Sequence, residues 1–88
     1  KLFLAANSVS LLKGLTTPNG MTADVKKALI SVSNEIIVLA DSSKFDHVSL
    51  YKILDCHDAS AIITDSDVDP EITNEFRENG VHLEIVKK

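Results

Sequence analysis

The stretch Ile36–Phe45, with the sequence IIVLADSSKF, decides the fold class of this chain. Its first five residues are all apolar, which predicts a strand that is buried on both faces. Such strands are typical of parallel sheets that are covered by helices. One acid, two hydroxyls and one base follow the strand directly. Ligands of open parallel α/β sheets bind just outside the carboxyl ends of the strands, so this loop is the first place to look for a ligand.

Strand and helix signals alternate along the rest of the chain. The motif Asp69–Pro70 predicts a helix start, because an N-cap acid precedes a proline at the first helical position. Alternating apolar residues from Val81 to Val86 predict a half-exposed strand near a sheet edge. Together the patterns predict strands at Leu2–Ala6, Ile36–Ala40, Ala61–Thr64 and Val81–Val86, and helices at Thr22–Asn34 and Pro70–Asn79.

The first helix should begin with Thr22 as its cap and bury one apolar face. That face is predicted from the helical spacing of Val25, Ala28, Leu29 and Val32. Two other segments carry weaker signals. The segment Asn7–Gly20 is rich in Ser, Thr, Asn, Gly and Pro and is predicted to be a loop. The segment Val48–Leu54 fits either a short helix or an irregular extended segment.

This order of elements predicts right-handed βαβ units. We therefore expect an α/β fold with three layers, α/β/α, around a mainly parallel sheet. The length of 88 residues suits one small domain. A net charge of −4 disfavours nucleic-acid binding by these residues themselves. The single cysteine, Cys56, fits a small buried apolar residue in a reducing cytoplasm, and no apolar run is long enough to span a membrane.

Polar loops follow three of the predicted strands, and parallel strands would bring these loops to one sheet edge. The residues that could converge there are Asn7, Lys13, Thr16, Thr17, Asp41 and Lys44. The alternative is that these side chains only close turns and cap helices, as polar loop residues often do. Both interpretations stay open on spacing alone. The chain shows no phosphate-binding glycine-rich loop and no regular metal-ligand spacing, so we expect neither cofactor nor metal.

Four short motifs resemble, in order, the C-terminal sensor domain of DeoR-type bacterial transcription regulators. They are KGLTTPN at 13–19, VKKA at 25–28, ADSSKF at 40–45 and ITD at 63–65. The resemblance implies that residues 1–88 are the C-terminal portion of a domain that senses a phosphorylated sugar. It also implies that the first half of the sensor and a winged helix-turn-helix domain lie outside these residues. DNA would be contacted only through that missing domain, in the cytoplasm.

The sensor domain of that family is itself similar to ribose-5-phosphate isomerase. The resemblance places Asn7, Lys13, Asp41 and Lys44 at ligand-binding positions, while Thr22 stands where the isomerase has its general base. Because threonine cannot abstract a proton from carbon at neutral pH, we expect binding without catalysis. Two alternatives are a fragment of a sugar-phosphate isomerase or coenzyme A transferase, and a purely structural α/β module.

Two departures from the regulator pattern touch the predicted site. The chain has AANS at 5–8 where the family has GADG, and Asp46 where the family has glycine. A sheet that lacks its first half would also leave an edge and an apolar face uncovered. Uncovered edges and patches invite pairing, so we expect a homo-oligomer formed through Val81–Val86 or through the bare face.

Overall fold

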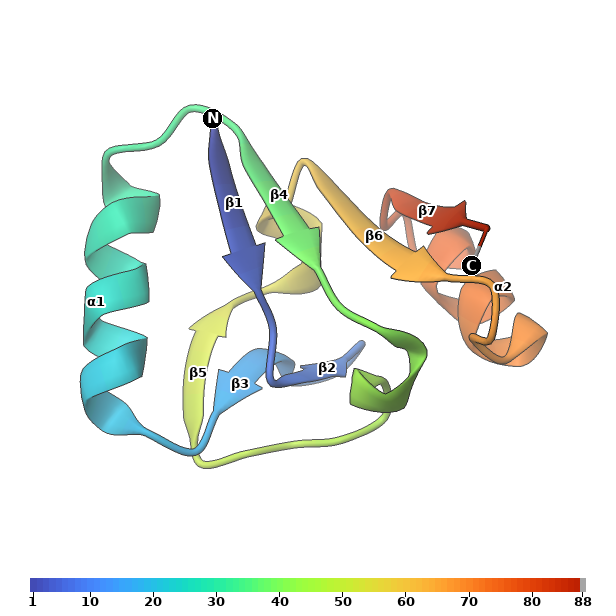
Figure 1. Ribbon diagram of the computed structural model, residues 1–88, viewed down its shortest axis with the longest axis horizontal. Coiled ribbons are helices and arrows are strands. Elements are labelled where there is room, and N and C mark those ends of the chain that lie inside the picture. The colour runs from blue at the N-terminus through green and yellow to red at the C-terminus, as the bar shows by residue number, and fades with distance from the viewer. Residues whose placement is uncertain (88) are drawn as a thin grey trace.

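Four parallel strands form the main sheet of the computed structural model, which describes residues 1–87. Figure 1 shows them side by side in the order β1-β4-β6-β7. The predicted parallel pairing of the second and third strands is confirmed, because Val38 lies opposite Ile62. The predicted edge strand is confirmed as well, since β7 is last in the order. The bounds are β1 (Leu2–Ala5), β4 (Ile36–Leu39), β6 (Ala61–Asp65) and β7 (Leu83–Val86).

A small antiparallel sheet corrects two predictions. Its strands, in the order β2-β3-β5, are β2 (Ser8–Ser10), β3 (Gly14–Thr17) and β5 (Tyr51–Leu54). The predicted loop Asn7–Gly20 therefore holds a hairpin. Of the two alternatives for Val48–Leu54, the helix is wrong, and the segment is extended and ends in a regular strand. Local composition misses these strands because β2 and β3 are rich in polar residues, and because β5, the second partner of β3, lies far along the chain. Gly14, with φ +77, is required at the turn, because a Cβ there would stand 2.2 Å from the Leu54 carbonyl oxygen.

The two helices are α1 (Gly20–Ser31) and α2 (Pro70–Glu78), with single 3-10 turns η1 (Ser42–Lys44) and η2 (Cys56–Asp58). The predicted start of α2 is confirmed, because the Asp69 side chain accepts a hydrogen bond from the backbone N–H of Glu71. The predicted cap of α1 is wrong by three residues. Asn19 caps this helix, and its Oδ1 accepts a hydrogen bond of 3.0 Å from the N–H of Thr22.

All the connections of the parallel sheet lie on one of its faces. The strands progress in a single direction, β1 to β4 to β6 to β7, and right-handed crossovers then place every connection on the same side. The core lies under these connections, where Val9, Val38, Ile62 and Phe76 are fully buried. Among residues 1–87 no helix or strand covers the opposite face. The predicted third layer is therefore not formed by the described residues. Burial of β4 on both faces holds for Ile36, Ile37 and Val38, whereas Leu39 at its end is 41% exposed.

The predicted inward face of α1 is wrong. Val25, Leu29 and Val32 are exposed, whereas Ala23 is buried and Ile30 packs against the core. The helix packs mainly against β5 and β3, at the side of the parallel sheet beside β1 (Figure 1). Val25 and Leu29 of the predicted apolar stripe are thus not packed in the core, and they line a groove between α1 and β1.

Cys56 behaves as a small buried apolar residue, as predicted. It is 1% exposed, and its thiol donates a hydrogen bond of 3.4 Å to the carbonyl oxygen of Ser10. Burial raises the pKa of this thiol to about 11, so it is not a thiolate nucleophile at neutral pH. No helix within residues 1–87 is long and apolar enough to cross a membrane.

We predict that two aromatic rings in the core are energetically coupled. Phe45, which follows η1, meets Phe76 of α2 edge to face, with ring centroids 5.4 Å apart. A double-mutant cycle of Phe45→Leu and Phe76→Leu, followed by urea unfolding, should give a coupling energy of about 0.5–1.5 kcal/mol. The control pair, Phe76→Leu with the exposed Leu12→Ala, should be additive within about 0.5 kcal/mol. Additivity of the two aromatic substitutions would contradict the prediction.

Candidate functional site

Three polar side chains gather at the carboxyl edge of the parallel sheet. Asn7 follows β1, Asp41 follows β4, and Asp65 ends β6. Backbone hydrogen bonds hold these strand ends together: the N–H of Ala6 donates to the carbonyl of Leu39, and that of Ala40 donates to Ile63. The convergence that parallel strands predict is therefore present for these loops.

The loop after β4 is organised by the carboxylate of Asp41. Its Oδ1 accepts a hydrogen bond of 2.9 Å from the backbone N–H of Ser43, and a second one from the Ser43 hydroxyl. These bonds, that from the hydroxyl first, lower the pKa of Asp41 below its ordinary value, and the nearby Lys44 acts in the same direction. Asp41 is exposed and ionised at neutral pH, so it can accept hydrogen bonds from a ligand.

A second carboxylate, that of Asp65, connects this loop to the neighbouring strand end. Its Oδ2 accepts a hydrogen bond of 3.0 Å from the N–H of Ser42, and its Oδ1 accepts one of 2.9 Å from the N–H of Asp67. One side chain thus ties the end of β6 to the first residue of η1. Sequence reasoning did not give Asp65 this role. The available signal was its position at the end of the strand that pairs with IIVL.

Lys44 lies where η1 meets the β2–β3 hairpin. The next residue, Phe45, bridges to Val9 of β2, and the N–H of Asp46 donates a hydrogen bond of 2.8 Å to the Val9 carbonyl. Lys44 is partly buried, and no carboxylate of residues 1–87 forms an ion pair with it. Asp46 has φ +60, the left-handed region that favours glycine, which is the residue of the regulator pattern at this position.

The structure places the other predicted site residues away from this loop. Thr16 and Thr17 are buried in β3, and the Thr16 hydroxyl accepts a hydrogen bond of 2.8 Å from the N–H of Ser49. Lys13 is exposed at the turn of the hairpin. With Thr16 and Lys52 it lines a separate hollow of about 440 Å³. The structure therefore brings Asn7, Asp41 and Lys44 to one edge and leaves Lys13, Thr16 and Thr17 beside it.

Thr22, which the resemblance places where the isomerase has its general base, has no ionisable side chain. Thr22 lies in the first turn of α1, bonded through its N–H to the cap Asn19. Within residues 1–87 no three or more His, Cys, Asp or Glu side chains form a group that could hold a metal ion. The chemistry available at the sheet edge is thus hydrogen bonding and charge, from one amide, two carboxylates and one ammonium group.

Comparison with known proteins gives a consistent result. Residues 1–66 match the family model described as DeoR C terminal sensor domain. The chain is 34% identical over 85 residues to a protein of Escherichia coli O157:H7 assigned as the aga operon transcriptional repressor, covering 97% of this chain and 32% of the relative. It is 30% identical over 80 residues to the HTH-type transcriptional regulator GlpR of Haloferax volcanii, covering 91% and 31%. It is 42% identical over 67 residues to the transcriptional repressor AccR of Agrobacterium fabrum, covering 75% and 26%. The chain spans about a third of the length of the curated relatives it matches.

We predict that the Ser43 hydroxyl keeps the pKa of Asp41 low. The substitution Ser43→Ala should raise the pKa of Asp41 toward the ordinary value of 3.8, because the largest stabilising hydrogen bond to the carboxylate is lost. Carboxyl-carbon NMR during a pH titration measures this value directly. The matched control Ser42→Ala keeps the backbone N–H that Asp65 binds and should leave the pKa of Asp41 unchanged. A pKa of Asp41 that is the same in both variants would contradict the prediction.

Proposed function

This chain belongs to the DeoR family of transcriptional regulators as part of their sensor domain, and we propose that its Asp41–Lys44 loop binds a phosphorylated sugar. Binding would control a helix-turn-helix domain elsewhere in the full-length regulator, so the chain would reach DNA only through that domain. Because two relatives carry the word repressor in their names, we further propose that the parent protein represses genes of sugar metabolism in the cytoplasm.

The observation that carries this proposal is the pairing of one unengaged cation with one ionised carboxylate at the sheet edge. Lys44 has no ion-pair partner in residues 1–87, so its ammonium group is available to a phosphate. The neighbouring Asp41 accepts hydrogen bonds and suits the hydroxyl groups of a sugar. Asn7, exposed at the end of the adjacent strand, can donate and accept.

The loop is also placed where a ligand could bias the rest of the domain. Asp65 joins η1 to the end of β6, so a ligand held at Asp41 and Lys44 would act on two strand ends at once. A ligand shifts a conformational equilibrium only by its difference in affinity for the two states. In this proposal the two states differ in the arrangement of these loops, and the helix-turn-helix domain responds to that difference.

We predict that loss of Lys44 weakens effector binding. A charge-assisted hydrogen bond contributes roughly 1.5–3 kcal/mol, so Lys44→Ala in the full-length regulator should raise Kd about tenfold to a hundredfold. The measurement is isothermal titration calorimetry with a panel of phosphorylated sugars. The control Lys27→Ala removes an exposed lysine of α1 and should leave Kd unchanged. Equal affinities of wild type and Lys44→Ala would remove Lys44 from the site.

The alternative, an isomerase or transferase fragment, does not agree with the comparisons. The relatives are transcriptional regulators and not enzymes, which confirms the prediction of a non-catalytic domain. Thr22, which stands where the isomerase has its general base, donates its backbone N–H to the cap residue Asn19. Its side chain has a hydroxyl and no carboxylate.

We therefore predict that the full-length protein does not interconvert phosphorylated aldoses and ketoses. Proton transfer between adjacent carbons needs a positioned base, and none stands at Thr22. Product analysis after incubation with the same sugar panel tests this. Conversion of a phosphorylated aldose into a ketose at a rate that rises with the concentration of the full-length protein, and that persists in the Lys27→Ala variant, would overturn the prediction.

A further inference from the structure

The hydroxyl of Thr64 is buried without a hydrogen-bond partner. Thr64 is 2% exposed, and its Oγ1 is the one buried side-chain nitrogen or oxygen of residues 1–87 that lacks a partner. Other buried hydroxyls are bonded: Thr16 accepts a hydrogen bond of 2.8 Å from the N–H of Ser49, and Thr73 donates one of 3.4 Å to the carbonyl of Asp69. An unpaired buried polar group raises the free energy of the conformation that contains it.

Packing alone does not account for a hydroxyl at this position. Side chains alternate along a strand, so Thr64 shares its face of β6 with Ile62, which is fully buried in the core. Its register partner in β7 is another apolar residue, Ile85. Valine has nearly the same shape as threonine and favours strands as well, but it has no hydroxyl to leave unpaired. The unpaired hydroxyl therefore requires an explanation of its own.

The Asp41–Lys44 loop begins beside Thr64. The N–H of Ala40, which precedes the loop, donates a hydrogen bond of 3.1 Å to the carbonyl of Ile63. The carboxylate of Asp65 accepts one of 3.0 Å from the N–H of the first residue of η1. These two bonds connect the loop to the residues on either side of Thr64. A small shift of the loop therefore changes which of its oxygens lie near the Thr64 hydroxyl.

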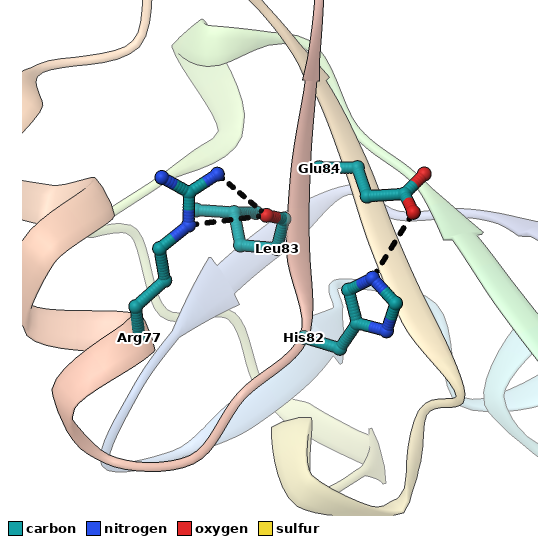
Figure 2. Close-up of polar contacts among 4 residues, drawn as sticks. All are labelled: Arg77, His82, Leu83 and Glu84. Carbon is teal, nitrogen blue, oxygen red and sulfur yellow. Dashed lines mark hydrogen bonds and ion pairs between the residues drawn. The ribbon is translucent and has the colours of Figure 1, made fainter.

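The neighbour of β6 on the other side is held in place. β7 pairs with β6 from Ile62 to Asp65. Figure 2 shows Arg77 of α2 reaching the carbonyl of Leu83 in β7, to which its Nε and Nη2 donate hydrogen bonds of 3.3 and 2.9 Å. A strand that is bonded to both a strand and a helix does not shift easily. Of the two neighbours of Thr64, the loop is thus the one that can move.

A second unfavourable feature lies at the other end of the same loop. Asp46 has φ +60 and is the one residue other than glycine with positive φ in residues 1–87. Aspartate adopts this region at a cost that glycine does not have. Strained residues are concentrated at ligand clamps and switch regions. The unpaired hydroxyl and the positive φ therefore both raise the free energy of one segment, Asp41–Asp46, in its described conformation.

We propose that the segment Asp41–Asp46 has a second conformation, in which Thr64 donates its hydroxyl proton to an oxygen of the η1 turn, and that effector binding favours this conformation. The unpaired hydroxyl disfavours the ligand-free state, and the new hydrogen bond stabilises the bound state. Thr64 is then a positioning residue that strengthens binding without touching the ligand. The part played by the effector rests on the proposed function, whereas the second conformation does not.

The first measurement needs no effector. Thr64→Val in the full-length regulator removes the unpaired hydroxyl and should raise the Tm by about 2 °C or more. Relaxation-dispersion NMR of the ligand-free wild type should show microsecond-to-millisecond exchange at the amides of residues 42–46, and Thr64→Val should reduce it. The matched control Thr73→Val removes a bonded hydroxyl, so it should lower the Tm and leave this exchange unchanged. A wild type without exchange would overturn the proposal, and so would a lower Tm for Thr64→Val, which would mean that the hydroxyl has a partner such as an internal water.

The second measurement is calorimetry of the full-length regulator with ribose 5-phosphate, fructose 6-phosphate and inorganic phosphate. For each probe that binds the wild type, Thr64→Val should raise Kd about fivefold or more, the lower range of coupling between sites. Thr64→Ser retains the hydroxyl and should keep Kd near the wild-type value. Asp46→Gly should raise Kd as well, because it removes the cost of the ligand-free conformation.

The outcomes separate this inference from the proposed function. Equal Kd values for the wild type and Thr64→Val would overturn the role of Thr64 in binding. A wild type that binds none of the three probes, but shows the loop exchange that Thr64→Val reduces, would support the second conformation and refute only the proposed function.

Discussion

The handedness of three crossovers is the constraint on which the rest of this structure depends. A right-twisted strand that feeds a connection back to a parallel neighbour does so with one hand. Because β1, β4, β6 and β7 follow one another in one direction across the sheet, the connections stack on a single face. The core between that face and the connections is complete, with Val38 and Ile62 fully buried at its centre. No helix or strand of residues 1–87 lies on the other face, which is mostly apolar apart from Glu84 beside Ile63.

The same constraint places the functional loops. Parallel strands present their carboxyl ends at one edge, so Asn7, Asp41 and Asp65 all lie at the ends of neighbouring strands although they are far apart in the sequence. The small antiparallel sheet then positions the end of the Asp41–Lys44 loop, because Val9 of β2 pairs with Phe45 and accepts a hydrogen bond from the N–H of Asp46. Two carboxylates occupy the backbone N–H groups of Ser42 and Ser43, which fixes the loop shape and leaves the Lys44 ammonium as its available cation.

Membership in the DeoR family gives this geometry its meaning. A sensor must bind a small molecule and transmit the event, and the Asp65 contact directly connects the loop that we propose as the binding site to a central strand. The strained backbone of Asp46, at a position where the regulator pattern has glycine, lies at the end of the same loop. A residue held at positive φ persists only when the surrounding packing fixes it, and here the bridge between Phe45 and Val9 supplies that packing.

The sequence by itself determined the parallel sheet, the start of α2, the edge position of the last strand and the family. These features depend on local signals: continuous apolar runs, an Asp-Pro cap and short motifs in a fixed order. Only the tertiary structure decided the hairpin at 8–17, the strand at Tyr51–Leu54 and the exposure of the α1 stripe. In the candidate site, the placement of Asn7, Asp41 and Lys44 after strand ends could be predicted from the sequence, whereas the Asp65 contact and the burial of Thr16 and Thr17 could not. Most of these misses depend on a partner distant in the sequence, as β3 does on β5 and Ser42 on Asp65, and local pattern carries no information about which distant segment will pair. The hairpin is local, but its polar composition is that of a loop.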